Sequence, residues 1–436
     1  MGGKRLGNIR AVHWLSRPIP PGPGRPRIWL LALGAAVLVA VAAQAGCSGA
    51  STGGQTALTR DQRWRQDVAY LAAKLPQVHV NGLLQVPATS WNAAAARLEA
   101  EVPRLSDGQV IVGMARMVAM LHDDETVVTW PANSQFPFNL TWADGNLYLV
   151  SVPNGDRDLL GAQIVGVGGH PIAQVLSEIG SVIDYQGPVL HEDEEADYLT
   201  YHPSLLNWLG LTPSPSEATF TVQTVSGARA MLRLKAATAL RANALASVPA
   251  PLYMRDQDKP YWMQILASQH AVYVKYNQCL DDNGFQQLAA QALAILRERP
   301  AYRLIVDLRD NSGGDTAPFT SLIDGLTADP ALRRPDRVFG LVNRYTDSSA
   351  TLDANMLAQV PNAVLIGQEP GDPIDEYGDE SSFTLPNSDV QVIYTTAIVN
   401  GTGKLLAAPD IDVAPTIQQL LAGTDPVLQA ALSYHS

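Results

Sequence analysis

Apolar residues recur at helical spacing along the first part of the folded chain. Between residues 59 and 125, two segments each begin with a capping box, in which a Thr or Ser is followed three positions later by Gln. The apolar positions after each box are three or four residues apart, as on one face of a helix. They are Trp64, Val68, Leu71 and Leu75 after Thr59, and Val110, Met114, Met117 and Leu121 after Ser106. Residues 59–125 are therefore predicted to form a small helical unit.

From residue 126 to about 250 the pattern changes to short runs in which apolar and polar residues alternate. Residues 147–150 and 220–225 are examples, each beside an Asp-Gly or Ser-Gly pair that is typical of a turn. We therefore expect residues 126–250 to be rich in β-strands. Residues 161–176 resemble a strand followed by a helix, which leaves a PDZ-like peptide-binding element open. The acidic run 192–195 is interpreted as a solvated loop.

Strand and helix patterns alternate between residues 255 and 432. Buried-strand runs separated by helical stripes form a β-α-β succession, which implies a mostly parallel sheet covered by helices. The strands are expected at 271–275, 304–308, 338–342 and 363–366, with helical stripes at 285–296 and 352–360. The fold class is therefore α/β, with a helical unit and a β-rich region ahead of the core.

The first 47 residues have the order of a secretory leader. A basic stretch is followed by the uncharged apolar run 28–45 and then by Cys47. The sequence Ala-Gly-Cys at 45–47 resembles a bacterial lipobox, which favours lipidation of Cys47. A cleaved signal or an uncleaved transmembrane anchor remain alternatives, since the run is long enough to span a bilayer. Residues 48–58 are small and uncharged, as in a flexible tether. We expect an exported protein, anchored on the outer face of the cytoplasmic membrane.

Charge and composition narrow the classes of partner and cofactor. The formal net charge is −12, and the leader holds six basic residues and no acidic one, so the remaining chain is more acidic still. Such a surface repels phosphate backbones, so we expect no nucleic-acid partner. The histidines show no paired metal-ligand spacing, and no metal or cofactor is predicted. Cys279, the second of two cysteines, is expected to be a small buried residue and not a reactive thiol.

Two segments of the core could carry chemistry. The first, residues 305–315, places a Gly-Gly pair directly after a buried strand. Glycines there can take positive φ and aim backbone N–H groups into a cleft, as an oxyanion hole requires. The second, residues 345–350, places serines at the junction of a strand and a helix. A helix N-terminus favours negative charge on a reacting oxygen.

Together these segments resemble the paired motifs of the S41 serine peptidases, which include the C-terminal-processing and tricorn-like enzymes. Asp-Leu-Arg-x-Asn-x-Gly-Gly spans 307–314, and Thr-x-Ser-Ser-Ala follows at 346–350. Residues 276–279, 378–388 and 409–428 are also similar to tricorn-like members. The resemblance implies a ClpP/crotonase-like core that acts on peptides or proteins. It also implies Ser348 as the nucleophile, and amides of Gly313 or Gly314 and of Ser349 as the oxyanion hole.

The chain departs from this family in the residue that would accept the serine proton. Members carry a lysine about 25 residues after the serine, where this chain has Pro373, or a histidine in an Asp-Gly-His-Thr motif. Here that motif reads Asp-Asp-Glu-Thr at 123–126, so Glu125 occupies the histidine position. A carboxylate near its ordinary pKa is a much weaker base than imidazole. His122 lies three residues earlier, and on a continuing helix it would share a face with Glu125.

Three functions therefore stay open. The first is an exported serine peptidase in which Ser348 attacks and Glu125 or His122 assists. The second is a catalytically inactive relative that keeps the cleft to bind peptides. The third is a hydrolase for another ester or amide, since the same oxyanion geometry serves several acyl transfers. The sequence predicts no oligomeric state.

Overall fold

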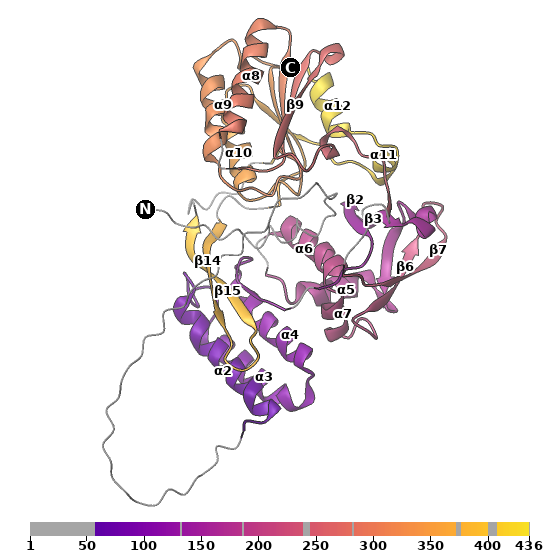
Figure 1. The fold of residues 1–436 in the computed structure, drawn as a ribbon, viewed down its shortest axis with the longest axis vertical. Helices are drawn as coiled ribbons and strands as arrows, with labels where there is room; N and C mark the ends of the chain where they lie inside the picture. Colours follow the sequence, from indigo (N-terminus) through magenta and orange to yellow (C-terminus); the bar gives the residue numbers. More distant parts are fainter. Residues whose placement is uncertain are drawn as a thin grey trace, which may run out of the picture.

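A computed structural model describes residues 57–130, 133–184, 187–238, 245–280, 283–371, 376–399 and 408–435. The predicted leader, and the tether apart from residues 57 and 58, lie outside these ranges. The described chain forms three parts (Figure 1): a helical unit, a middle region built on an antiparallel sheet, and a core built on a mostly parallel sheet. The three parts follow the order that the hydrophobic pattern predicts.

The helical unit contains both predicted capping boxes. The side chain of Thr59 accepts from the Gln62 amide at the start of the first helix, and Ser106 does the same with Gln109. The apolar stripes are buried and pack together, with Trp91 at their centre fully buried. The elements are α2 (Arg60–Val78), α3 (Ala88–Glu101), η1 (Val102–Arg104), α4 (Asp107–Val118) and η2 (Ala119–Leu121).

The middle region combines a seven-stranded sheet with three helices. Its strands are β2 (Asn139–Ala143), β3 (Asn146–Pro153), β4 (Gln163–Val167), β5 (His170–Pro171), β6 (Glu217–Gln223), β7 (Arg229–Lys235) and β8 (Leu245–Ser247). Its helices are α5 (Ile172–Gly180), α6 (Pro188–Tyr201) and α7 (Pro203–Trp208), and η3 (Asn154–Leu159) follows β3. The strand-then-helix pattern at 161–176 is present as β4, β5 and the start of α5.

The acidic run 192–195 is a correction to the sequence-based prediction. It lies inside α6 and not in a solvated loop, and Asp193 and Glu195 are both buried. Pro188 stands in the first turn of this helix, where its missing N–H costs nothing. Leu190 and Leu199 of the same helix are buried as well. A run of acidic residues in the sequence therefore does not predict that these side chains are exposed to solvent.

The core holds a six-stranded sheet in the order β16-β13-β12-β11-β10-β9. All neighbouring pairs are parallel except β9 and β10, so the predicted parallel sheet is confirmed. Helices α8, α9 and α10 pack on one face and α12 on the other (Figure 1). The strands are β9 (Tyr261–Leu266), β10 (Ala271–Tyr276), β11 (Arg303–Asp307), β12 (Val338–Val342), β13 (Val364–Gly367) and β16 (Ile411–Asp412). The helices are α8 (Gly284–Glu298), α9 (Ala317–Ala328), α10 (Ser349–Ala358), α11 (Ile417–Leu421) and α12 (Pro426–Ser433), with η4 (Leu252–Met254) and η5 (Ala267–Gln269) near β9.

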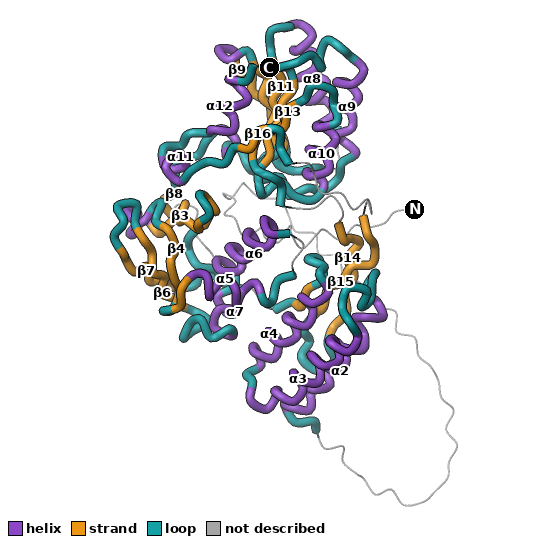
Figure 2. The backbone as a smooth tube through the Cα atoms, turned by 180° about the vertical axis from the view of Figure 1, so that it is seen from behind, coloured by secondary structure: helices purple, strands orange, loops and turns teal. Residues whose placement is uncertain are grey.

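A long hairpin joins the core chain to the helical unit (Figure 2). It consists of β14 (Glu376–Thr384) and β15 (Gln391–Val399), and β15 pairs antiparallel with the short β1 (Val127–Val128). At the hairpin tip, the amides of Asn387 and Ser388 donate to the buried Asp67 carboxylate of α2, at 3.0 and 2.8 Å. The hairpin therefore holds both α2 and the β1 segment after α4, although it lies more than two hundred residues further along the chain.

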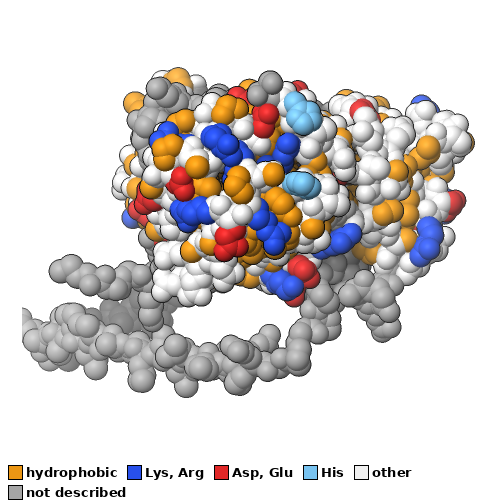
Figure 3. Space-filling view, turned by 90° about the horizontal axis from the view of Figure 1, so that it is seen from above, with side chains coloured by type: hydrophobic (Ala, Val, Ile, Leu, Met, Phe, Trp, Pro, Cys, Tyr) orange, Lys and Arg blue, Asp and Glu red, His pale blue; other side chains and the backbone are white. Residues whose placement is uncertain are grey.

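The end of the core seen from above carries many basic side chains (Figure 3), although the chain as a whole is acidic. Two arginines of the core have a structural use at the C-terminal end of α8. Arg334 donates to the Pro300 carbonyl at 3.2 Å, and the buried Arg337 donates to the Leu296 carbonyl at 3.1 Å. Cations near the last carbonyls of a helix are stabilising.

Candidate active site

Ser348 occupies a strained turn between β12 and α10. Its backbone has φ 51° and ψ −128°, and it is the residue directly before the first residue of the helix. Non-glycine residues rarely adopt such angles, which are a recurrent feature of serines held at a strand-to-helix elbow. The Ser348 side chain makes no capping hydrogen bond to α10, although serine is a common cap. The turn therefore does not use this hydroxyl to start the helix.

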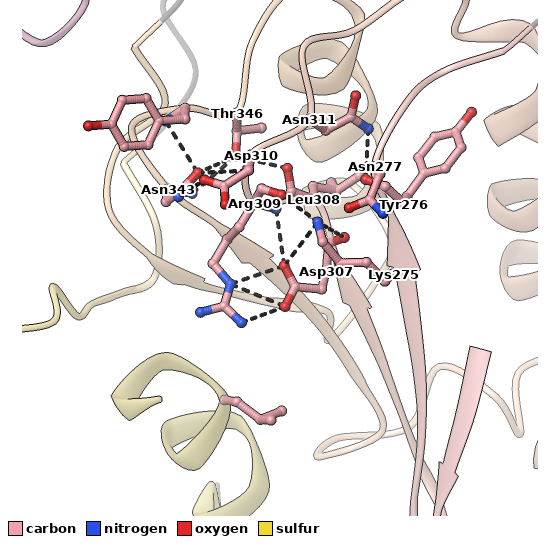
Figure 4. A network of polar contacts seen from close by, with 12 residues as sticks. Lys275, Tyr276, Asn277, Asp307, Leu308, Arg309, Asp310, Asn311, Asn343 and Thr346 are labelled. Carbon is pink, nitrogen blue, oxygen red and sulfur yellow. Dashed lines mark hydrogen bonds and ion pairs between the residues drawn. The ribbon is translucent and has the colours of Figure 1, made fainter. Parts of the chain in front are cut away.

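The loops that follow β11 and β12 are joined by hydrogen bonds. The Asp347 amide donates to the Asn311 carbonyl at 2.9 Å, and the Thr346 hydroxyl donates to the Leu308 carbonyl at 3.2 Å. Asp310 and Asn343 point toward each other (Figure 4), and the Asn343 amide donates to the Asp310 carboxylate at 2.8 Å. Because β11 and β12 are parallel neighbours, their carboxyl ends bring the two predicted motifs together.

Gly313 lies directly against the serine turn. A Cβ on Gly313 would approach the Ser348 Cβ to 2.6 Å and the Ser349 amide nitrogen to 2.7 Å, and its φ is +86°. Gly314 has φ +136°, and a Cβ there would come within 2.0 Å of the Cys279 carbonyl oxygen. Both positions require glycine, for positive φ and for close approach. The Gly-Gly pair thus touches the segment that it was predicted to serve.

Two backbone amides at this contact have no acceptor within the described residues, namely those of Gly314 and Ser349. The Gly313 amide, in contrast, donates to the Asn311 side-chain oxygen at 2.9 Å. The Ser349 amide lies at the N-terminus of α10, where the helix dipole favours an anion. Of the two glycines expected for the oxyanion hole, the geometry therefore favours Gly314, paired with Ser349.

Buried charges hold the base of the Gly-Gly loop in place (Figure 4). Arg309 pairs with Asp307 at 2.5 Å and, across the sheet edge, with Asp425 at 2.8 Å. Lys275 lies 3.8 Å from Asp307 and donates to the Arg309 carbonyl. Burial opposes ionisation of Asp307, but the Arg309 guanidinium outweighs it and lowers the pKa of that carboxyl. The Asp-Leu-Arg part of the motif thus forms a buried ion-pair network, and the neighbouring Lys275 is fully buried within it.

A polar cluster that the sequence did not reveal lies behind the loop. Asn311 binds the Gly313 amide with its oxygen and donates to the Tyr276 carbonyl at 2.9 Å. The Cys279 thiol lies 3.3 Å from the Asp353 carboxyl, and both residues are buried. Burial raises the pKa of the Cys279 thiol, in keeping with the predicted inert cysteine, and raises the pKa of Asp353 to about 8.

The Asp-Asp-Glu-Thr motif is organised around Asp123. This buried carboxylate accepts from His79 at 2.7 Å, from the Thr126 hydroxyl at 2.6 Å and from the Thr395 hydroxyl at 2.5 Å. Its other oxygen accepts from the Glu125 amide at 3.0 Å. His79 Nδ1 accepts from the Asn81 amide at 3.2 Å, so both ring nitrogens of His79 are engaged. This histidine therefore has a structural role, for which its position in the sequence offered no signal.

His122 does not share a helical face with Glu125, which corrects the geometry expected from the sequence. The helix ends at Leu121, and His122 adopts a left-handed conformation with φ 56°. Its Nδ1 lies 3.4 Å from the buried Asp184 carboxylate. The ring lines a cavity of about 550 Å³, together with Arg116 and His191. His122 is thus directed to the middle region.

Within the described ranges, no group of three or more His, Cys, Asp or Glu side chains could hold a metal ion. Over the same residues, no helix combines the length and apolar character needed to cross a membrane. Cys47 and the apolar run before it lie outside the described residues, so the predicted leader and lipidation stay predictions.

No family model matches the sequence, and no curated protein matches it significantly. Solved structures do match. Mature CPAF in complex with lactacystin superposes with a TM-score of 0.60 at 13% identity, over 85% of this chain and 98% of that chain. Another structure of mature CPAF gives a TM-score of 0.59 at 12% identity, over 85% and 96% of the two chains. The photosystem II D1 C-terminal processing protease gives a TM-score of 0.41 at 15% identity, over 85% and 99%.

The CPAF matches extend over the helical unit, the middle region and the core, because they cover most of both chains. At this level of sequence identity the matches show the fold and give no information about the site residues. They agree with the α/β architecture and with the parallel sheet that carries the two facing loops. The chain therefore shares the overall fold of mature CPAF.

Proposed function

We propose that this protein is an exported serine-type peptidase with Ser348 as its nucleophile. The observation that carries the proposal is the contact between the strained Ser348 turn and the Gly-Gly loop, with the open amides of Gly314 and Ser349 beside it. A strained serine next to two unpaired N–H groups is the arrangement that acyl transfer requires. A turn used only for capping would not need this strain.

In the proposed reaction, the Ser348 Oγ attacks a peptide carbonyl carbon and its proton passes to a base. The carbonyl oxygen becomes an oxyanion that accepts from the Gly314 and Ser349 amides. Each such donor is worth about 10²–10³ in rate when it is aimed at the developing charge. The positive end of α10 adds to the same effect. Collapse of the intermediate breaks the C–N bond, and the base passes its proton to the leaving nitrogen, which departs as the amine. Water then hydrolyses the acyl-serine, which releases the carboxylic acid and restores the Ser348 hydroxyl.

The proposal assigns proton acceptance to Glu125, with His122 as the weaker candidate. Glu125 occupies the place of the family histidine, and the Asp123 network fixes the backbone on either side of it. His122 is turned toward Asp184, and His79 is engaged at both nitrogens. A carboxylate base limits the rate of attack at neutral pH, so slow turnover is expected. A peptide-binding protein without catalysis is the alternative.

The proposed substrates are peptides or protein tails. The resemblance of residues 307–314 and 346–350 to the paired motifs of the S41 serine peptidases supports this class. The acidic net charge disfavours nucleic acids. The proposed location is the outer face of the cytoplasmic membrane, through lipidated Cys47. Cys47→Ala should abolish incorporation of labelled fatty acid and move the protein out of the membrane fraction, whereas continued labelling would exclude this anchor.

The test of the function is labelling with a fluorophosphonate probe, which reacts with activated serines. The wild-type protein should be labelled and Ser348→Ala should not. Ser226→Ala is the matched control, since it removes the hydroxyl of an exposed serine in the turn between β6 and β7, outside the proposed site. Labelling that persists in Ser348→Ala would refute the assigned nucleophile. Absence of labelling in wild type, with a peptide retained in a binding assay, would favour the non-catalytic alternative.

A further inference from the structure

Arg344 lies two positions after β12 and four positions before Ser348, in the same turn. Its neighbour Asn343 is directed into the core, where it binds Asp310. The Arg344 side chain instead reaches the middle region. Consecutive residues of the turn that carries Ser348 are thus held by two different parts of the molecule.

The partner of Arg344 is the acidic helix α6. The guanidinium donates to Glu192 at 2.9 Å and to the Val189 carbonyl at 3.2 Å, and its Nε lies 2.6 Å from the Asp193 carboxylate. The side chains of Arg344 and Asp193 are each only 10% exposed. An ion pair this far from solvent is screened little by salt, and loss of one partner leaves a buried charge.

Other segments enclose this contact. The Trp142 ring lies 5.7 Å from the guanidinium, and its Nε1 donates to the Glu192 carbonyl at 2.9 Å. The Gly371 amide donates to the Arg344 carbonyl at 3.1 Å. A Cβ on Gly371 would come within 2.7 Å of that carbonyl and 3.6 Å of the Leu190 Cα. The turn, α6, β2 and the loop after β13 therefore meet at Arg344.

The energetics of Asp193 depend on this arginine. Burial raises the pKa of the Asp193 carboxyl well above its ordinary value, and the charge of Arg344 offsets only part of that rise. Burial by itself would lower the pKa of Arg344, but Asp193 more than compensates and raises it. The contacts with α6 thus favour the charged form of Arg344, whereas burial still disfavours the charged form of Asp193. A shift of α6 away from the turn would disturb both.

We propose that Arg344 is a positioning residue through which helix α6 of the middle region sets the conformation of the Ser348 turn. This inference rests on the proposed role of Ser348. Its consequence is that α6 and the Ser348 turn are coupled, so that loss of the Arg344 contact with α6 changes how Ser348 is held. The residue touches no reacting atom, so it acts only through the turn.

The experiment compares Arg344→Gln, Asp193→Asn and the double variant with wild type. The first readout is hydrogen exchange of the Thr346, Asp347 and Ala350 amides, which are bonded within and across the turn. Each single variant should speed this exchange at least about tenfold, and the double variant should add little, as expected for two partners of one interaction. The second readout is the rate of fluorophosphonate labelling, which should fall in parallel, while Arg344→Lys restores part of it.

Arg297→Gln is the matched control, because Arg297 also pairs with an aspartate of the core at 3.1 Å but is half exposed. It should change neither readout. Unchanged exchange in the turn of folded Arg344→Gln and Asp193→Asn would overturn the inference, whatever the labelling. If Arg344→Gln does not fold, Asp193→Asn and Glu192→Gln decide the matter alone. Absence of labelling in wild type would count against the proposed function. Hydrogen exchange of the turn amides would still test whether Arg344 couples α6 to the Ser348 turn.

Discussion

Gly313 and Ser348 touch at the Cβ position: a methyl group on the glycine would lie 2.6 Å from the Ser348 Cβ. Because φ of Gly313 is also +86°, Gly313→Ala should strain the backbone and displace the serine turn. We expect a loss of about 2–4 kcal/mol in the free energy of unfolding and loss of fluorophosphonate labelling. Urea denaturation and labelling measure the two effects.

Gly155→Ala is the control for this substitution, since a Cβ at that exposed site would meet nothing within 4 Å. It should change stability by less than about 0.5 kcal/mol. If Gly313→Ala keeps wild-type labelling and stability, the close packing of the two loops is not needed to present Ser348.

The Asp353 carboxyl predicts how stability depends on pH. Burial raises its pKa from an ordinary 3.8 to about 8. Between these values the folded chain keeps a proton that the unfolded chain releases, so stability falls as the pH rises from about 4 to about 8. Asp353→Asn removes this titration and should therefore gain stability relative to wild type as the pH increases, by at most about 1.4 kcal/mol per unit. Urea denaturation at pH 5 and pH 8.5 gives the comparison.

The pH dependence of the stability difference between Asp353→Asn and wild type decides whether the pKa of Asp353 is raised. A difference between Asp353→Asn and wild type that is equal at both pH values would mean that Asp353 titrates normally in the folded protein. Cys279→Ala serves as a partner variant, because it removes the thiol that lies 3.3 Å from the carboxyl without changing charge. It should leave the direction of the pH dependence intact.

The strands and the serine turn of the core could be predicted because their signals are local. Strands buried on both faces of a parallel sheet are continuous apolar runs, as Leu304 to Val306 and Val338 to Val342 are. Positions that need glycine, such as Gly313 and Gly314, are equally visible in a sequence. Parallel neighbours then bring the ends of successive strands together without further information.

The acidic helix α6 could not be predicted, because what neutralises it is distant in the sequence. Glu192 and Arg344 are 152 positions apart. A run of acidic residues normally marks a solvated segment, and only the fold brings an arginine to it. The same holds for Asp123, whose partners are His79, the residue directly after α2, and Thr395 of β15. Buried polar networks assembled from distant segments leave no periodic pattern.

The Asp123 network predicts a large effect of one carboxylate on stability. Asp123→Ala removes the acceptor of His79, Thr126 and Thr395 and leaves buried donors without a partner. We expect a loss of about 3–5 kcal/mol in the free energy of unfolding, together with faster hydrogen exchange in β1 and β15. Thr395→Val removes one donor with little change of shape and should cost only about 1 kcal/mol. Equal costs for the two variants would show that the carboxylate is not the centre of the network.

A substitution at Glu125 tests directly whether a weak proton acceptor limits the rate of hydrolysis at the proposed site. Glu125→His places an imidazole at the position of the family's histidine, on a backbone held by Asp123 and Thr126. Imidazole titrates near neutral pH and is a far better proton acceptor for a serine than an ordinary carboxylate. If Glu125 faces Ser348 as proposed, peptide hydrolysis should rise by about 10²–10⁴ at pH 7.5. The measurement is cleavage of an unstructured protein substrate, followed at several pH values.

Two controls make this prediction decisive. The double variant Glu125→His, Ser348→Ala should show none of the gain, because the new base would have no hydroxyl to activate. Glu125→Gln should lower any activity of the wild type, since it keeps the size of the side chain but removes its capacity to accept a proton. A gain that also appears with Ser348→Ala would locate the new activity elsewhere. No gain in a folded Glu125→His variant would mean that residue 125 does not face the serine, and the peptide-binding alternative would then be favoured.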